Sequence, residues 1–148
     1  MIHEEISAAH AAFQALDVRE LNSLQMAYVG DTVHDLYVRS MLLSKGMSVG
    51  KMHKQAVRMV SAGAQARMLC EIEAELSETE ADVARRGRNS QAKHAAPKHA
   101  DPADYAHATG LEALWGYLYL SGQTQRLDEL IKLALARTED LWQKQTSK

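Results

Sequence analysis

The most restrictive feature of this 148-residue chain is an apolar run near its C-terminal end. Residues 110–120 read GLEALWGYLYL, and Glu112 is the one charged side chain among them. A helix that is apolar around its whole circumference is stable only when other elements cover it. The run therefore predicts a buried helix, and it carries an acid whose burial needs a partner such as a cation.

The remaining sequence predicts an all-α fold. It has two Pro, 5% aromatic residues, little β-branching and abundant Ala, Leu, Met, Gln and Glu, which are helix-forming residues. No convincing strand, internal repeat or second domain is expected. The expected helices cover residues 22–45, 50–61, 62–76, 77–89, 102–120 and 124–143, with a short helix within 1–20 and an exposed loop over 90–100. Expected N-caps are Asn22 or Ser23, Ser61, Ser77 and Asp101.

Composition excludes several classes of protein. One Cys excludes a disulfide framework and a Cys-based zinc site, and it fits a reducing compartment. The first ten residues, MIHEEISAAH, lack the basic-then-apolar pattern of a signal segment. No apolar run approaches the roughly 18 residues that a membrane span needs. We therefore expect a cytoplasmic protein without a membrane partner.

Charge is segregated along the chain, although the formal net charge is only −2. Residues 51–70 carry four Lys or Arg and no acid, residues 71–84 carry six acids and no Lys or Arg, and residues 85–100 carry five Lys or Arg and no acid. Such blocks either form solvated helix faces or meet a charged partner. The last block ends a helix and continues through a loop, where its cations complement the helix dipole and can also reach phosphates.

Asp31 and Asp35 lie four residues apart, and therefore on one face of a strongly apolar helix. Acids in such a segment need a cation, an Arg or a metal as partner, and Arg39 is one turn beyond Asp35. Gly30 lowers helix propensity by about 1 kcal/mol relative to Ala but allows close approach of another helix or a ligand. If Glu112 meets Asp31 across a helix pair, the two carboxylates form a site suited to Mg²⁺ or Mn²⁺. With a basic loop nearby, this predicts phosphodiester hydrolysis.

These segments together resemble the mini-ribonuclease III family, a branch of ribonuclease III. The resemblance rests on residues 24–31 (LQMAYVGD), which are similar to the family's signature helix, and on residues 111–120 (LEALWGYLYL), which are similar to its second acidic helix. Shorter matches follow in the same order at residues 52–54, 60–62, 65–66, 85–89 and 97–98, with Asp101 downstream. The similarity covers about residues 20–135.

The resemblance implies a ribonuclease III-like helical catalytic domain, here residues 21–145 after an N-terminal extension over 1–20, without a double-stranded-RNA-binding domain. It implies a homodimer that cleaves double-stranded RNA with Mg²⁺, for which Mn²⁺ is a possible substitute. The implied substrate is the precursor of 23S ribosomal RNA, and a ribosomal protein is a further candidate partner. We also expect the apolar helix 110–120 to help form the dimer interface.

Residue roles follow from the same resemblance. Asp31 matches the catalytic aspartate and Glu112 the metal-binding glutamate, while Asp35 is either a further metal ligand or a structural residue. Ala27 and Thr109 stand where full-length ribonuclease III carries acids, which leaves few protein ligands for a metal. The expected RNA contacts are Arg85, Arg86, Arg88, Asn89, Lys93 and Lys98, with His53 and Lys54 as further candidates.

Two other functions remain open from the sequence. The dipeptide His34-Asp35 occurs in HD-type metal phosphohydrolases, although that reading needs further His and Asp ligands on other helices. A non-catalytic helical RNA-binding or assembly factor would keep the basic loop around a degenerate site.

Overall fold

A computed structural model describes residues 16–143, and these residues contain helices and no strand, as predicted. The elements are two 3-10 helices and seven α-helices: η1 Val18–Glu20, α2 Ser23–Ser44, α3 Val49–Val60, α4 Ala62–Ile72, η2 Glu73–Glu75, α5 Glu78–Ala92, α6 Pro102–Leu120, α7 Thr124–Arg137 and α8 Asp140–Gln143. Most of the expected N-terminal extension lies outside the described residues, so the boundary at residue 20 stays a prediction. Among the described residues, no helix is long and apolar enough to cross a membrane.

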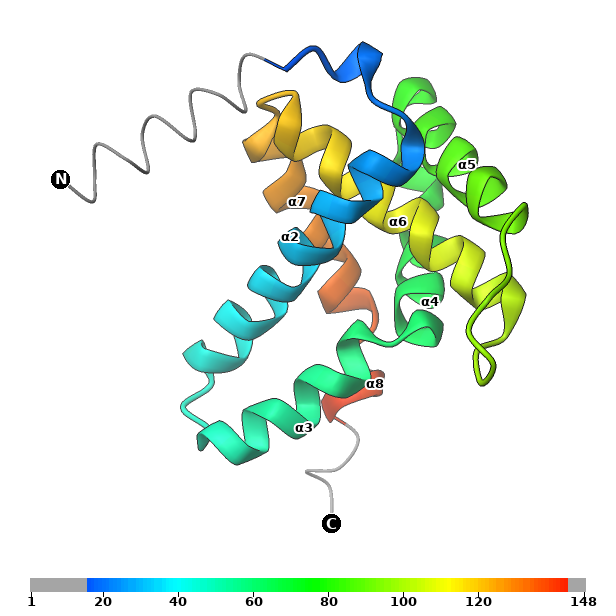
Figure 1. The fold of residues 1–148 in the computed structure, drawn as a ribbon. Coiled ribbons are helices and arrows are strands. Elements are labelled where there is room, and N and C mark those ends of the chain that lie inside the picture. The colour runs from blue at the N-terminus through cyan, green and yellow to red at the C-terminus, as the bar shows by residue number, and fades with distance from the viewer. Residues whose placement is uncertain (1–15, 144–148) are drawn as a thin grey trace, which may run out of the picture.

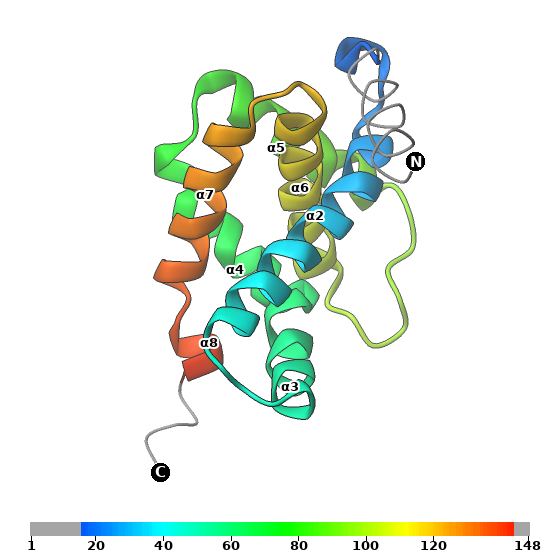
Figure 2. The ribbon, with the colours of Figure 1, turned by 90° about the vertical axis from the view of Figure 1, so that its left-hand side faces the viewer.

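The apolar helix α6 is the centre of the fold, with α2 and α5 packed along it and α4 and α7 completing its surroundings (Figures 1 and 2). Leu111, Leu114, Trp115 and Leu118 on α6 are completely buried. The expectation of a buried helix is confirmed. The expectation that this helix helps form a dimer interface is wrong, because elements of its own subunit cover its apolar surface.

Glycines bring the backbones of α2 and α6 into direct contact. A Cβ atom at Gly30 on α2 would overlap the carbonyl oxygen of Glu112, and one at Gly116 on α6 would overlap the carbonyl oxygen of Met26. On the other flank of α6, a Cβ at Gly110 would lie 2.7 Å from the Ala84 carbonyl oxygen of α5. Larger residues at these positions would force the helices apart, so the glycines set the spacing of this three-helix layer.

Local signals begin the helices where the sequence predicts. Asn22 and Gln25 form a capping box at the start of α2, and Ser77 and Glu80 form another at the start of α5. Ser61 caps α4, and the Asp101 carboxylate accepts a hydrogen bond from the backbone N–H of Ala103 at the start of α6. Each cap satisfies backbone donors that the first turn leaves unpaired.

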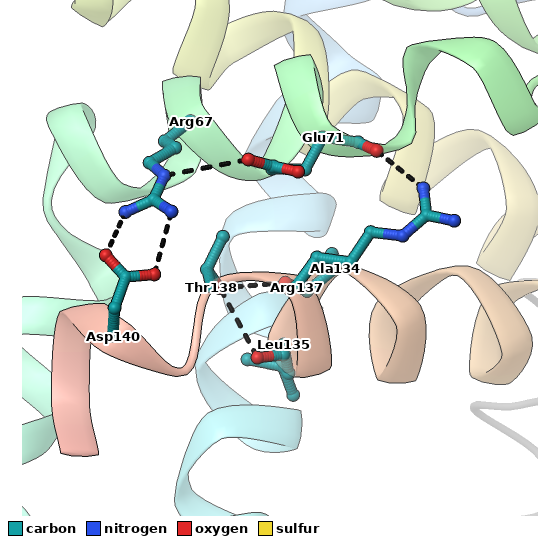
Figure 3. Close-up of polar contacts among 7 residues, drawn as sticks. All are labelled: Arg67, Glu71, Ala134, Leu135, Arg137, Thr138 and Asp140. Atoms are coloured by element: carbon teal, nitrogen blue, oxygen red, sulfur yellow. Dashed lines mark hydrogen bonds and ion pairs between the residues drawn. The ribbon is translucent and has the colours of Figure 1, made fainter.

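Three helix ends differ from expectation. The helix expected to reach residue 76 ends at Ile72 and continues as η2, and α5 extends past Asn89 to Ala92. The helix expected over 124–143 is interrupted after Arg137. There the Thr138 hydroxyl donates a 2.7 Å hydrogen bond to the Ala134 carbonyl, and its backbone N–H turns to the Leu135 carbonyl (Figure 3).

Contacts with α4 hold the segment after this interruption in place (Figure 3). The Arg67 guanidinium forms a bidentate ion pair with Asp140 and lies 3.8 Å from a Glu71 carboxylate oxygen. Arg137 donates a 2.7 Å hydrogen bond to the Glu71 carbonyl. The break in the helix therefore depends on long-range partners that are 66 to 73 residues away in sequence.

We predict that Gly30→Ala strongly destabilises the protein, because the new methyl group meets backbone atoms of α6 that have no rotamer to adopt. The expected loss is at least about 3 kcal/mol in the free energy of unfolding, measured by denaturant titration. Gly50→Ala is the matched control, since Gly50 is helical in α3 with open space around it. That change is expected to stabilise by about 0.5–1 kcal/mol. Equal effects of the two substitutions would contradict the proposed role of Gly30.

Candidate active site

A pocket of about 370 Å³ lies where α2, α4, α5 and α6 converge, and it contains both predicted catalytic acids. Asp31 comes from α2 and Glu112 from α6. The other lining residues are mostly apolar or uncharged: Leu24, Ala27, Tyr28, Val60, Ala62, Gln65, Gln91, Tyr105, Ala108 and Thr109. The sequence-based condition that Asp31 and Glu112 meet across a helix pair is thus fulfilled.

The glycine contact between the two helices explains how the acids meet. Asp31 directly follows Gly30, and Gly30 packs on the backbone of Glu112 itself. Asp31 on α2 therefore lies beside Glu112 on α6. Asp31 is exposed, while Glu112 is partly buried. The arrangement places one carboxyl group toward solvent and one deeper in the pocket.

Burial raises the pKa of the Glu112 carboxyl to about 9, and the hydrogen bond and negative charge of nearby Asp31 act in the same direction. A hydrogen bond from Gln65 acts in the opposite direction and lowers the pKa. At neutral pH and without a bound cation, Glu112 is therefore protonated. A divalent cation between the carboxyl groups would favour the ionised form of both.

The donor set fits a hard, partly hydrated cation. Within residues 16–143, no group of three or more His, Cys, Asp or Glu side chains could hold a metal. Two carboxylates are sufficient for Mg²⁺, which commonly keeps several water ligands and binds substrate phosphates through the remaining positions. Ala27 and Thr109 both line the pocket, so the positions without an acid face the same space. Thr109 uses its hydroxyl to donate to the Tyr105 carbonyl at 3.0 Å.

Asp35 does not line this pocket and forms a 3.0 Å ion pair with Arg39 on the next turn of α2. This arrangement favours the structural role over the metal-ligand role. The role of Asp35 stays a prediction.

His34 belongs to the core and is 1% exposed. Its Nδ1 accepts a 3.1 Å hydrogen bond from the Trp115 indole, so its Nε2 carries the proton that it donates to the Met59 carbonyl at 3.0 Å. Burial lowers the pKa of this imidazole. Both ring nitrogens are occupied, which leaves none for a metal and removes the basis of the HD-type hypothesis.

The predicted RNA-contacting residues are dispersed. Arg85 and Arg86 both pair with Asp82, and the Arg86 distance is 2.9 Å. Arg86, Asn89 and Lys93 line a groove of about 540 Å³ between α5 and the start of α2, together with Arg19.

The remaining candidates lie elsewhere. Arg88 borders a smaller hollow with Arg85, and Lys98 is exposed in the loop between α5 and α6. His53 lines an apolar groove between α2 and α3, and Lys54 is exposed nearby on α3. The structure therefore divides these candidates among several surfaces and does not bring them together in the acidic pocket.

Sequence reasoning did not assign a role to several residues of these surfaces. Gln65 appears only as part of a short motif, yet its side chain is 3% exposed and lines the acidic pocket. Arg19 was likewise not identified, although it lines the α5 groove. A buried Gln has no distinctive sequence spacing, and Arg19 lies outside the charge blocks, so neither gives a signal before the helices are placed.

Comparison with known proteins agrees with this architecture. The model of the ribonuclease III domain matches residues 24–123. A mini-ribonuclease 3 from Symbiobacterium thermophilum is 50% identical over 115 residues, which cover 77% of this chain and 88% of the relative. A mini-ribonuclease 3 from Streptococcus pneumoniae is 37% identical over 127 residues, covering 84% and 98% respectively. A crystal structure of a Fusobacterium nucleatum protein has a similar fold, with a TM-score of 0.74 at 24% identity over 84% of this chain and 99% of that one.

We predict that Glu112→Gln stabilises the metal-free protein in a pH-dependent way. The folded-state pKa lies above the unfolded value, so the wild type loses stability as pH rises from about 4.5 toward about 9. The variant lacks this loss, and its advantage is expected to grow by on the order of 1–3 kcal/mol between pH 5 and pH 8. Denaturant unfolding in EDTA measures the difference.

Glu80→Gln is the control of opposite sign. Its hydrogen bonds from Arg126 lower the pKa of Glu80, so its stabilisation is present above about pH 4.5 and is lost as pH falls further. The Glu80 variant should be less stable than the wild type at pH 7 and should approach it in acid. A pH-independent difference for Glu112→Gln would contradict the assignment of that group.

Proposed function

Because this chain belongs to the ribonuclease III family and is an endoribonuclease of the type that cleaves double-stranded RNA, we propose that its substrate is the precursor of 23S ribosomal RNA and that its cofactor is Mg²⁺, replaceable by Mn²⁺. The observation that carries the proposal is the meeting of Asp31 and Glu112 in one pocket. Two acids from different helices meet in a pocket otherwise lined by uncharged residues, so no basic side chain of the pocket neutralises them. They fit a site that binds a cation and, through it, a phosphate.

The protein's own contribution to hydrolysis is positioning and charge. A bound divalent cation would activate a water molecule and stabilise the leaving oxygen of the phosphodiester. Asp31, the more exposed acid, would bind the cation at the entrance of the pocket and face the RNA. The contact of Gly30 with the backbone of Glu112 fixes the main chain of Glu112, and this restricts where its carboxyl group can lie. With both acids ionised beside a cation, the rigid helix pair would supply preorganised negative charge.

We place the RNA along the cationic residues of α5 and the loop that follows it. Arg88, Lys93 and Lys98 have no ion pair among those found in the described part of the chain, whereas Asp82 partly neutralises Arg85 and Arg86. Asn89 can donate to phosphate or 2′-OH groups from the same groove. His53 and Lys54 would contact a more distant part of a duplex. Replacing Arg88, Lys93 and Lys98 with Ala should reduce the dependence of RNA affinity on salt, and an unchanged slope would contradict this placement.

We propose that the protein is a homodimer whose interface lies on the outer face of α2, in place of the expected α6 interface. Tyr28, Leu36 and Leu43 on this face are 83%, 63% and 68% exposed, and Val49 and Val57 on α3 are exposed as well. Large apolar side chains gathered in this way are typical of an interaction surface. Tyr28 also lines the acidic pocket, so the interface would adjoin the active site. Sedimentation at micromolar concentration should give a dimer for the wild type and a monomer for Leu36→Glu; a wild-type monomer would contradict the proposal.

A cytoplasmic location and assistance from a ribosomal protein are also part of the proposal, and both derive from the resemblance described above. Cleavage of protein-free precursor RNA, with and without added ribosomal proteins, tests the second point. The non-catalytic alternative has no specific support, since both acids are present and share one pocket.

We predict that Asp31→Asn abolishes cleavage while leaving the fold intact. Asp31 is exposed, so the substitution costs little stability, but it removes one of two carboxylates from the cation site. The expected loss of cleavage rate is at least about 100-fold. The measurement is mapping of RNA ends after incubation of precursor 23S RNA with Mg²⁺, with EDTA as the metal-free reference.

Asp35→Asn is the matched control for this experiment, because it removes the same charge one helical turn away and outside the pocket. It should retain cleavage within a few fold of the wild type. A large loss for Asp35→Asn would assign that residue to the site, and near-normal cleavage by Asp31→Asn would overturn the catalytic assignment.

A further inference from the structure

The Gln65 side chain is an unexplained polar group in the wall of the acidic pocket. It is 3% exposed, and its Oε1 atom is buried without a hydrogen-bond partner. An unpaired buried acceptor costs on the order of 1–3 kcal/mol, so such atoms are uncommon in native proteins. A missing ion or water is one physical reason for an atom of this kind.

The other half of the amide fixes which way the oxygen points. Gln65 Nε2 donates a 3.0 Å hydrogen bond to the Val60 carbonyl at the end of α3, and it also reaches the Glu112 carboxyl. Exchanging the amide nitrogen and oxygen would place two acceptors, Oε1 and the Val60 carbonyl oxygen, against each other. The orientation is therefore determined by the protein, and it leaves Oε1 as the free atom.

The surroundings distinguish Gln65 from the other buried glutamine with a free oxygen. Gln55 on α3 is 7% exposed, and its Oε1 also lacks a partner, but it does not line the acidic pocket. Gln65, in contrast, shares the pocket with Asp31 and Glu112. The inference thus rests on an unpaired oxygen of a residue that lines the same pocket as two carboxylates, and not on an unpaired oxygen alone.

We propose that Gln65 Oε1 is the third protein oxygen ligand of the divalent cation held by Asp31 and Glu112. The inference rests on the proposed function, because it assumes that the two acids form a cation site. Mg²⁺ and Mn²⁺ accept neutral amide oxygens as well as carboxylates. A neutral ligand has a particular advantage in this pocket, since it adds coordination without a third negative charge beside two that already repel each other.

The three ligands would come from three helices, of which α2 and α4 both pack against α6. Gln65 is also tied to the end of α3 through Val60. Ligands on packed helices are held more rigidly than ligands on loops, and rigidity helps a site with few protein ligands to retain a cation.

The test is Mn²⁺ binding by the RNA-free protein, measured by electron paramagnetic resonance of the unbound ion. Gln65→Met keeps the length and approximate volume of the side chain but removes both polar atoms, and it is expected to weaken Mn²⁺ affinity by about 10-fold or more. Gln65→Glu keeps an oxygen at the same place but sets its second oxygen against the Val60 carbonyl, so it is expected to bind Mn²⁺ more tightly than Gln65→Met. Gln55→Met is the matched control and should bind like the wild type.

The outcomes separate the two proposals. If Asp31→Asn abolishes Mn²⁺ binding while Gln65→Met leaves it unchanged, the cation site stands and the role of Gln65 is refuted. If Gln65→Met and Gln65→Glu weaken binding equally, the amide nitrogen is the important atom and the oxygen-ligand proposal is refuted. If Asp31→Asn also leaves Mn²⁺ binding unchanged, the cation site itself fails. Circular dichroism of each variant shows that it is folded, and Gln65→Leu replaces Gln65→Met if the latter is not.

Discussion

The contact between the backbones of α2 and α6 is the constraint on which the rest of this structure depends. Gly30 and Gly116 remove the side chains that would otherwise separate the two helices. The resulting proximity allows a short chain to bury α6 almost completely. It also brings the residue after Gly30 beside Glu112, so the same contact that forms the core forms the candidate site.

The deep position of the Glu112 carboxyl lowers the stability of the protein at neutral pH when no cation is bound. Helix α6 is apolar, and an acid on it is desolvated, which raises the pKa of Glu112 to about 9. An acid at this place is unfavourable for folding without a cation, but it would supply a ligand in the cation site that we propose. The buried imidazole of His34 on α2 differs from Glu112, because hydrogen bonds with Trp115 and Met59 satisfy both of its nitrogens. His34 therefore has a structural role.

The structure also shows which cationic residues of the sequence form ion pairs with acids. The overall charge of −2 conceals cationic residues on α5 and its following loop, but Asp82 pairs with two of them, Arg85 and Arg86. The remaining cations, Arg88, Lys93 and Lys98, are fewer than the sequence block indicates. For a protein that binds RNA through its catalytic domain, this predicts modest and salt-sensitive affinity, because few counterions are released on binding.

The sequence by itself determined the helices, their caps and the pair of acids. These follow from interactions within a few residues, such as the capping box of Ser77 and Glu80 and the apolar run around Glu112. Only the tertiary structure decided that Asp31 enters the pocket while Asp35 pairs with Arg39, that α6 is covered within its own subunit, and that Gln65 completes the pocket wall. It also decided the break at Thr138, which long-range partners fix. Local hydrogen bonds act over one helical turn, whereas these features require residues that are distant in sequence to be brought into contact.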